Sequence, residues 1–269
     1  MTDSEGVAAA LLEAERTRVP IPPPTDASPD MTIAGAYAVQ QAGRTLRLAA
    51  GARPVGHKIG LTSAAMQEML GVDQPDFGYL TDAMVSPSGT VLQSAELIAP
   101  RAEAEVAFLI GAELAGPGLG VADVLAATEG VAAAIEVIDS RVADWRIQIA
   151  DTIADNASCG HVVIGEWRAL EDLDLAAVAG RMTVRDAGGA EETVEGRGDA
   201  VLGHPAAAIA WLARALDEFG GGTIAAGDVV IPGAFARALP VAAGAVAEAA
   251  VEGIGEVRVS FDGGQGGGA

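Results

Sequence analysis

The sequence predicts a mixed α/β fold, in which a small N-terminal α/β subdomain precedes a larger, β-rich domain. Residues 4–18 and 32–48 have the apolar spacing or the end signals of helices. From about Ala83 onward, short strand-like runs separated by turn residues dominate, and helical patterns return near 121–129 and 205–219. A chain of 269 residues has room for one large domain together with a small one.

The elements of the N-terminal part follow from local signals. The first helix ends at the proline run 20–24, a stiff connector, and Thr32 is a suitable N-cap for the second helix. A short strand over 55–61 and a helix over 62–70 follow. Turn-forming residues then predict a loop over 71–78.

The predicted boundaries divide the chain into three parts. Residues 1–75 form the subdomain and residues 76–261 the larger domain, and the glycine-rich tail 262–269 is expected to be disordered. Strands are predicted at 162–165, 228–231, 246–251 and 256–261.

Composition restricts the possible functions. A formal net charge of −21 argues against nucleic acid and anionic membranes as partners, because both require a basic surface. The single cysteine, Cys159, cannot form an internal disulfide, which suits a reducing compartment. The N-terminus lacks the pattern of a signal peptide, and no apolar run approaches the roughly 20 residues that span a bilayer. A cytoplasmic, soluble protein is therefore expected.

Three glutamates suggest a metal site. Glu103 and Glu105 lie two residues apart in the strand-like run 100–110, so their side chains point to the same face. Glu136 interrupts a second apolar run, 131–138. Buried carboxylates need a neutralising charge, and oxygen ligands suit Mg²⁺ or Mn²⁺. The alternative is a solvated face of a half-exposed sheet.

Lys58 and Asp76 are further candidates for chemistry. Lys58 lies among apolar residues of a predicted strand, where a cation either faces a negatively charged cleft or protects an edge strand. Asp76 is either a general base or the acceptor of a local side-chain turn. The three histidines, His57, His161 and His204, are interpreted as structural.

The segment 151–160, Asp-Thr-Ile-Ala-Asp-Asn-Ala-Ser-Cys-Gly, is rich in short polar side chains. These side chains either form the floor of a pocket or cap and turn the chain. The residues alone leave both interpretations open.

Six blocks in order resemble the 2-keto-4-pentenoate (2-hydroxypenta-2,4-dienoate) hydratases. These enzymes belong to the hydratase and decarboxylase branch of the fumarylacetoacetate hydrolase superfamily. The blocks are Gly-His-Lys-Ile-Gly-Leu-Thr at 56–62, Gly-Val-Asp-Gln-Pro-Asp-Phe-Gly at 71–78, Pro-Arg-Ala-Glu-Ala-Glu at 100–105, Ala-Ile-Glu-Val-Ile-Asp-Ser-Arg at 134–141, the segment 151–160, and Gly-Arg-Gly with Leu-Gly-His-Pro within 196–205.

The resemblance implies a β-rich roll of the fumarylacetoacetate hydrolase C-terminal type and a homo-oligomer. It also implies a Mg²⁺ or Mn²⁺ ion held by the matching Glu103, Glu105 and Glu136. Lys58 and Asp76 match candidate catalytic residues. Candidate substrate-binding residues are Ser158 and Gly233.

The implied reaction is the addition of water to a small anionic 2-hydroxydienoate, in the catabolism of aromatic compounds, to give a 4-hydroxy-2-oxo acid. Pro232-Gly233, where many relatives have Thr-Gly, resembles branches that act on longer or dicarboxylic dienoates. The alternatives are such a hydratase or a 2-oxo-3-hexenedioate (4-oxalocrotonate) decarboxylase. A non-enzymatic alternative is a subunit that binds a partner enzyme of the same pathway.

Overall fold

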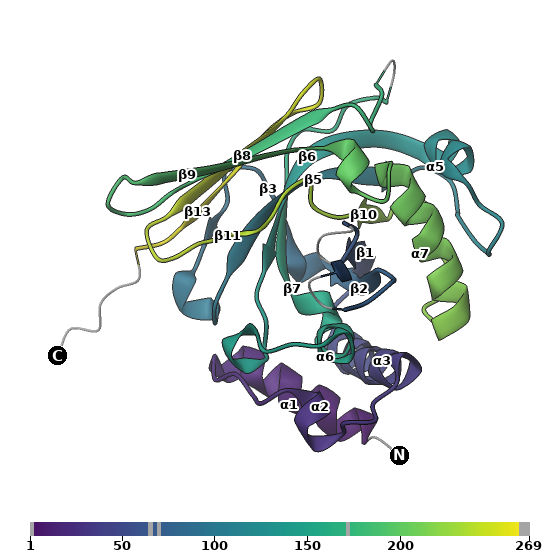
Figure 1. The fold of residues 1–269 in the computed structure, drawn as a ribbon, viewed down its shortest axis with the longest axis vertical. Coiled ribbons are helices and arrows are strands. Elements are labelled where there is room, and N and C mark those ends of the chain that lie inside the picture. Colours follow the sequence, from purple (N-terminus) through teal and green to yellow (C-terminus); the bar gives the residue numbers. More distant parts are fainter. Residues whose placement is uncertain (1–2, 64–66, 69–70, 171–172, 264–269) are drawn as a thin grey trace.

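The computed structural model describes residues 3–63, 67–68, 71–170 and 173–263. Helices α1 (Ser4–Thr17), α2 (Pro24–Ala27) and α3 (Ile33–Ala49) gather with α6 (Ile149–Ala154) at one end of the molecule (Figure 1). The side chain of Asp3 accepts a hydrogen bond from the Gly6 amide and caps α1, and Thr32 caps α3 through the Gly35 amide. The two predicted N-terminal helices are confirmed.

A large mixed sheet forms the centre of the molecule. Within the described residues it has eight strands, in the order β2-β1-β10-β5-β6-β7-β3, with β11 paired to β5. Its strands are β1 (Pro54–Gly60), β2 (Asp76–Thr81), β3 (Val85–Pro87), β5 (Arg101–Ile110), β6 (Thr128–Ile138), β7 (Cys159–Ile164), β10 (Val229–Ile231) and β11 (Leu239–Pro240). The long antiparallel pair β5 and β6 places apolar residues on both faces, as a covered sheet requires.

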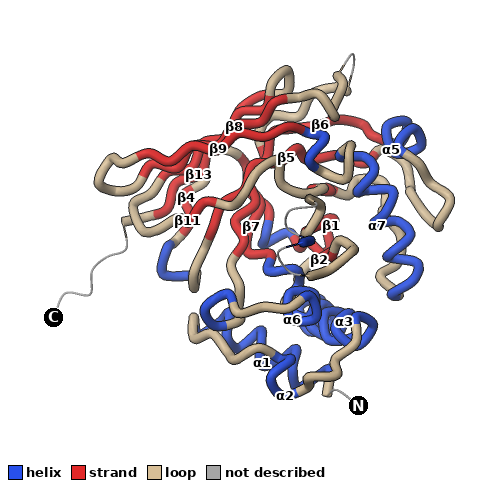
Figure 2. Tube along the Cα trace, viewed as in Figure 1, coloured by secondary structure: helices blue, strands red, loops and turns tan. Residues whose placement is uncertain are grey.

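A second sheet of five strands packs beside β5 and β6 (Figure 2). Its order is β4-β13-β12-β8-β9. The strands are β4 (Val91–Leu92), β8 (Ala179–Arg185), β9 (Glu191–Arg197), β12 (Val246–Val251) and β13 (Gly255–Phe261). The predicted strands at 228–231, 246–251 and 256–261 correspond to β10, β12 and β13, and 162–165 to the end of β7.

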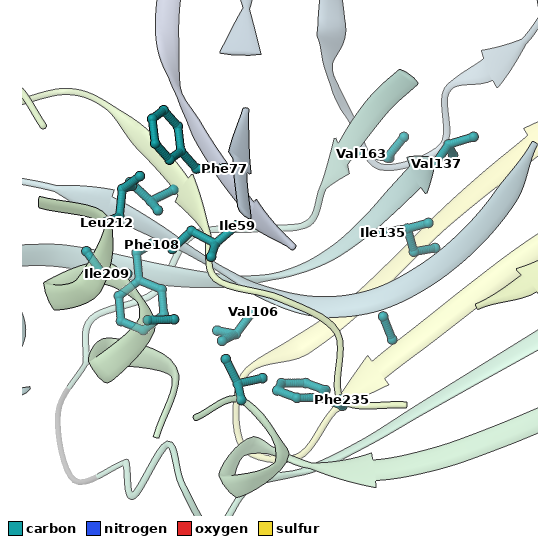
Figure 3. Close-up of a cluster of buried hydrophobic side chains, with 14 of the residues drawn as sticks. Ile59, Phe77, Val106, Phe108, Ile135, Val137, Val163, Ile209, Leu212 and Phe235 are labelled. Carbon is teal, nitrogen blue, oxygen red and sulfur yellow. The ribbon is translucent and has the colours of Figure 1, made fainter. Parts of the chain in front are cut away.

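Helix α7 (Pro205–Phe219) covers part of the large sheet. Helix α5 (Val121–Ala127) packs against α7. His204 caps α7, because its Nδ1 accepts a hydrogen bond from the Ala206 amide. Ile209 and Leu212 of α7 join Phe108 of β5 in a core cluster that extends to Ile135 (Figure 3). Short 3₁₀ helices occur at η1 (Asp82–Met84), η2 (Ser94–Glu96), η3 (Ala143–Trp145), η4 (Asn156–Ser158) and η5 (Gly198–Ala200).

One local prediction was wrong, and one predicted helix ends slightly earlier than expected. Asp76 does not lie in a loop: it is the first residue of β2, where it pairs with Gly60 of β1. The strand pairing and the burial of the neighbouring Phe77 outweigh the local turn signals. The helix expected near 121–129 ends at Ala127, and Thr128 begins β6, which is longer than predicted.

Several predictions lie outside the described residues. Most of the helix predicted over 62–70 and most of the tail 262–269 fall there. The boundary at residue 75 separates β1 from β2, which pair with each other, and the division into subdomains stays a prediction. None of the described helices has the length and apolarity needed to span a membrane.

Candidate metal centre

Glu103 and Glu105 on β5 meet Glu136 on the adjacent strand β6. Glu103 and Glu136 are direct partners in the antiparallel register. One carboxylate oxygen from each of the three residues lies within 4.8 Å of the others. Glu105 and Glu136 are 0% and 1% exposed, whereas Glu103 is only partly buried. The cluster therefore has a deep side at Glu105 and an accessible side at Glu103.

Burial makes the charged form of this cluster unfavourable. Burial, and then the charge of Glu136, raise the pKa of Glu103 to about 7, although Lys58 and Arg101 oppose the shift. Burial and the two neighbouring carboxylates raise the pKa of Glu105 well above its usual range. Burial also raises the pKa of Glu136, against the effect of Lys58. A cation bound between the three would reverse this penalty.

The donor set fits a hard divalent cation. All three ligands are carboxylate oxygens, which Mg²⁺ and Mn²⁺ prefer. The Oε1 atom of Glu105 is buried and has no hydrogen-bond partner within the described part of the chain. A buried acceptor without a partner is costly, and coordination to an ion would satisfy it.

Lys58 lies beside this cluster, on β1. Its Nζ is 3.2 Å from Glu136 Oε1 and donates a hydrogen bond of 2.8 Å to the Ala157 carbonyl. Although burial opposes it, the charges of Glu136 and Asp76 raise the pKa of Lys58 above its usual value, so that the ammonium stays protonated. Because β1 lies between β2 and β10, Lys58 does not protect an exposed strand edge.

Asp76 reaches the same region from β2. Its Oδ2 accepts a hydrogen bond from the Thr152 hydroxyl, and its Oδ1 has no partner among the described residues. A Cβ at Gly60 would lie 2.3 Å from Asp76 Oδ1 and 3.3 Å from Lys58 Nζ, so a glycine there leaves room for both side chains. Burial raises the pKa of Asp76, against the effect of Lys58. The partner Thr152 is remote in sequence, which excludes a purely local turn.

The turn η4 fixes the carbonyl that Lys58 contacts. Asn156, Ala157 and Ser158 all have left-handed backbone angles, with φ of 54°, 50° and 53°. Such angles cost about 1–3 kcal/mol each, and they persist only where the surrounding structure enforces them. The Asn156 side chain enforces them by accepting from the Tyr79 amide at 2.8 Å and donating to the Tyr79 carbonyl at 3.0 Å. Ser158 is 4% exposed, and its hydroxyl has no partner among the described residues.

Gly233 contacts Glu105, a candidate metal ligand. Its amide donates a hydrogen bond of 2.8 Å to Glu105 Oε2. Its φ of 120° favours glycine, and a Cβ at this position would lie 2.0 Å from the Thr62 hydroxyl. The structure thus brings Gly233 next to the cluster, while its role toward substrate stays a prediction.

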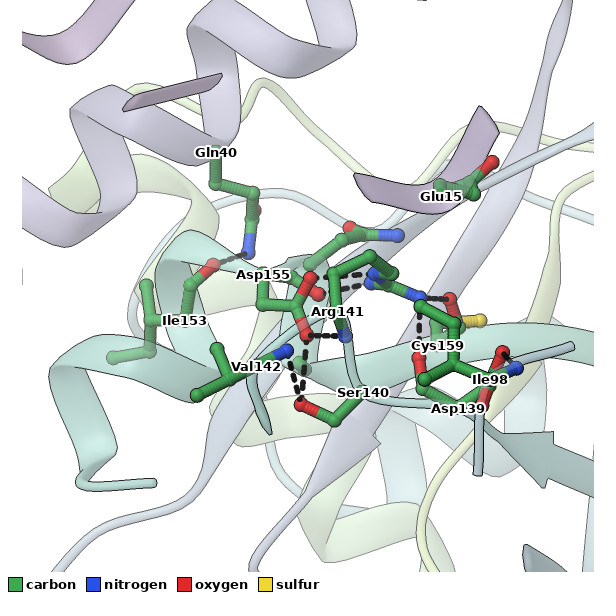
Figure 4. Close-up of polar contacts among 12 residues, drawn as sticks. Glu15, Gln40, Ile98, Asp139, Ser140, Arg141, Val142, Ile153, Asp155 and Cys159 are labelled. Carbon is green, nitrogen blue, oxygen red and sulfur yellow. Dashed lines mark hydrogen bonds and ion pairs between the residues drawn. The ribbon is translucent and has the colours of Figure 1, made fainter. Parts of the chain in front are cut away.

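A buried ion pair supports the turn and the start of β5 (Figure 4). Arg141 Nε donates to Asp155 Oδ1 at 2.5 Å, and Arg141 Nη1 donates to the carbonyls of Asp139 and Cys159, both at 2.7 Å. The Asp139 carboxylate accepts from the amides of Ile98 and Ala99. The polar segment 151–160 therefore caps and turns the chain, and its role as a pocket floor stays a prediction.

Two site residues escaped the sequence analysis. Thr152 donates a hydrogen bond to Asp76, and the Cys159 thiol lies near enough to Glu136 to favour the charged form of that carboxylate and lower its pKa. Thr152 belongs to the polar segment 151–160, but no local pattern connects it to Asp76. A cysteine at the start of a buried strand carries no distinct signal at all.

Residues 57–261 match the family described as fumarylacetoacetate (FAA) hydrolase C-terminal, and the chain therefore belongs to that family. Among its relatives are hydratases of the 2-keto-4-pentenoate type. The 2-hydroxyhexa-2,4-dienoate hydratase of Comamonas testosteroni is 46% identical over 93% of this chain and 94% of its own length. A 2-keto-4-pentenoate hydratase of Paraburkholderia phymatum is 43% identical, covering 96% of this chain and 97% of the relative.

A solved structure extends the comparison to the fold. The 4-oxalocrotonate decarboxylase from Pseudomonas putida G7, complexed with magnesium and adipate, superposes with a TM-score of 0.90 at 36% identity. The match covers 96% of this chain and 97% of that one. The predicted fumarylacetoacetate hydrolase type of fold and the family resemblance are confirmed.

Proposed function

We propose that this protein is a metal-dependent hydratase that converts 2-hydroxypenta-2,4-dienoate, or a close homologue, into a 4-hydroxy-2-oxo acid. The observation that carries the proposal is the junction of Lys58 with the carboxylate cluster, with Lys58 Nζ 3.2 Å from Glu136 and Asp76 on the adjacent strand. The hydratase names of relatives that span nearly the whole chain support it.

Glu103, Glu105 and Glu136 would hold the cation, and Mg²⁺ or Mn²⁺ suits their oxygens best. When bound, the ion supplies Lewis-acid stabilisation of negative charge on the substrate. The magnesium in the related decarboxylase structure agrees with this choice. Gly233 orients Glu105 through its amide, and Lys58 holds Glu136 through their ion pair.

Lys58 and Asp76 act on the substrate itself. The fixed positive charge of Lys58 favours the negative charge that develops on the 2-oxygen. A proton gained at C5, with loss of the 2-hydroxyl proton, gives a 2-oxo-3-enoate, and water then adds its oxygen at C4 and a proton at C3. Asp76, held by Thr152 with its second oxygen available, delivers and removes these protons. Ser158 offers an additional buried hydroxyl for substrate binding.

A second candidate is 2-oxo-3-hexenedioate decarboxylation. It is favoured by the similarity to the 4-oxalocrotonate decarboxylase, which is 36% identical over nearly the full length. In that reaction, the same carboxylate site would serve the enolate that remains after CO₂ leaves.

The experiment is a comparison of the two substrates. Purified protein is mixed with 2-hydroxypenta-2,4-dienoate or 2-oxo-3-hexenedioate, with Mg²⁺ or with a chelator, while ultraviolet absorbance and CO₂ are followed. We expect Mg²⁺-dependent loss of the dienoate chromophore without CO₂, and no turnover by Asp76→Asn. CO₂ release from the diacid together with an unchanged dienoate would establish the decarboxylase instead, and full activity under chelation would refute both.

The cellular setting is part of the same proposal. We infer a homo-oligomeric, cytoplasmic enzyme of aromatic catabolism, because its relatives are bacterial hydratases of dienoates. Light scattering of the purified protein tests the assembly, and a monomer at micromolar concentration would contradict it.

A further inference from the structure

Arg101 belongs to the same row of side chains as the metal ligands. It begins β5, and side chains alternate along a strand, so Arg101, Glu103 and Glu105 share one face. Ala102 and Ala104, on the opposite face, are 0% and 6% exposed and form part of the core. The row runs from the buried Glu105 through the partly exposed Glu103 to Arg101, which is also partly exposed.

The guanidinium of Arg101 rests on an aromatic platform. Its central carbon lies 4.4 Å from the centroid of the Trp145 ring. The indole Nε1 of Trp145 donates a hydrogen bond of 3.1 Å to the Ala99 carbonyl, and the Ala99 amide donates to Asp139 at 2.7 Å. The platform is therefore anchored to the main chain next to β5, which limits the positions available to the guanidinium.

The hydrogen-bonding capacity of Arg101 is unused. Within the residues that the structure describes, no carboxylate or carbonyl accepts a hydrogen bond from its guanidinium, and no ion pair includes it. The surface arginines Arg53, Arg185 and Arg237 each pair with a carboxylate, whereas Arg101 does not, although the acidic Glu103 lies two residues along the same strand. Five N–H donors in a planar fork match the geometry of a carboxylate.

The two cations near the cluster come from different strands, Lys58 from β1 and Arg101 from β5. Lys58 contacts Glu136 and the Ala157 carbonyl, next to Asp76. Arg101 precedes Glu103, the accessible candidate ligand, by two residues on the same face of β5. Since Lys58 is already engaged and the chemistry at the distal carbons is assigned to Asp76, the opposite side at Glu103 is left for the other end of the substrate.

We propose that Arg101 binds the carboxylate of the 2-oxo or 2-hydroxydienoate acid, holding this end of the molecule at the Glu103 side of the centre. The identity of the substrate rests on the proposed function, but the pairing of Arg101 with a 2-oxo acid carboxylate does not. In a chain with a net charge of −21, this arginine also offers an approaching anion a local positive charge.

Binding of two non-reacting acids tests the proposal. Calorimetry with the Mn²⁺-loaded protein measures the affinity for 2-oxobutyrate and for 2-oxohexanedioate, which carries a second, remote carboxylate. The variants are Arg101→Met and Arg101→Lys, and Arg185→Met, which removes one positive charge from the distant second sheet, is the control. Mn²⁺ affinity and melting temperature are measured for each variant.

We expect Arg101→Met to lower the affinity for both acids at least tenfold. The affinity for Mn²⁺ should stay equal or increase, because a positive charge near Glu103 is removed. Arg101→Lys should recover part of the affinity, and Arg185→Met should match the unmodified protein. A lower melting temperature with unchanged affinity for both acids would make Arg101 a purely structural partner of Trp145 and overturn the proposal. A lower affinity for 2-oxohexanedioate alone would assign Arg101 to the remote carboxylate and would also overturn the proposal. So would a complete lack of 2-oxobutyrate binding to the unmodified protein.

The outcome is separable from that of the proposed function. Absence of hydratase activity with the expected loss of 2-oxobutyrate affinity would reject the reaction and retain the role of Arg101. Hydratase activity together with a 2-oxobutyrate affinity that Arg101→Met leaves unchanged would support the reaction and reject the role of Arg101.

Discussion

The Lys58 ammonium lies 3.2 Å from the Glu136 carboxylate, and both side chains are almost completely buried. With Glu103 and Glu105 ionised, the four side chains carry two negative charges in excess. A divalent cation neutralises that excess. The ion pair thus connects the catalytic candidate Lys58 to the candidate metal centre, and the charge that remains there matches that of a divalent cation.

Replacing Glu105 by Gln should abolish metal-dependent turnover while preserving the fold. The amide keeps the shape of the side chain but removes a buried charge that its neighbours repel. We expect turnover to fall by at least about 10³-fold, and Mg²⁺ no longer to raise the melting temperature, because the ion loses a charged ligand. Thermal unfolding with and without Mg²⁺ measures this. A variant that Mg²⁺ still stabilises to the original extent would remove Glu105 from the metal site.

Replacing Lys58 by Met should destabilise the metal-free protein. Breaking a buried ion pair on one side costs about 3–5 kcal/mol, because Glu136 is left without its partner. The double variant Lys58→Met with Glu136→Gln should recover part of this loss, since neither charge remains. Urea unfolding in a chelator gives the coupling free energy. Strictly additive effects of the two substitutions would show that the pair does not contribute.

Replacing Gly233 by Ala should weaken metal binding through Glu105. The new Cβ would lie 2.0 Å from the Thr62 hydroxyl, so the chain must shift and the hydrogen bond to Glu105 is lost. Gly189→Ala is a matched control, because Gly189 also has a positive φ but no atom within 4 Å of the added Cβ. We expect the control to cost only about 1 kcal/mol of stability. Equal Mg²⁺ affinity in both variants would argue against the role of Gly233.

The buried His57 should make the protein less stable as the pH falls from 6.5 toward 4. Burial, and then the charge of Arg44, lower the pKa of His57 to about 4, so the unfolded chain binds a proton first as the pH falls. The contribution of the neutral His57 to the free energy of unfolding is complete above the unfolded-state pKa of about 6.5 and is lost as the pH falls below it. The loss is about 2 kcal/mol between pH 7 and pH 5.

The measurement is urea unfolding of the unmodified protein and of His57→Gln at pH 7 and pH 5. The difference in unfolding free energy between the two proteins should depend on pH by about 2 kcal/mol, with the unmodified protein losing more at pH 5. The same difference at both pH values would mean that His57 titrates normally in the folded state.

The family resemblance and local patterns in the sequence predicted the carboxylate cluster of the site. Alternation along a strand placed Glu103 and Glu105 on one face, and the isolated charge in an apolar run marked Glu136. For Lys58 the apolar environment in the sequence left two interpretations open, and the ion pair with Glu136 favours the cation that faces negative charge. These signals are local, because they depend on period and on the cost of burying a charge.

The rest depended on contacts between residues distant in sequence. Asp76 was assigned to a loop because turn residues surround it, whereas pairing with β1 makes it the start of a strand. Thr152, the Ala157 carbonyl and the platform of Trp145 under Arg101 have no sequence pattern that connects them to their partners. Such pairs are set by the strand order and by three-dimensional packing.

By itself, the sequence determined helices α1, α3, α5 and α7, long strands such as β5 and β6, and the residue types at the centre, since hydrophobic period, end signals and buried charge are properties of neighbouring residues. Only the tertiary structure decided which side of the centre is open, which oxygen of Asp76 is available and that Lys58 pairs with Glu136. These features arise where the β1, β2, β5 and β6 side chains meet η4 and η3, and their geometry depends on the whole fold.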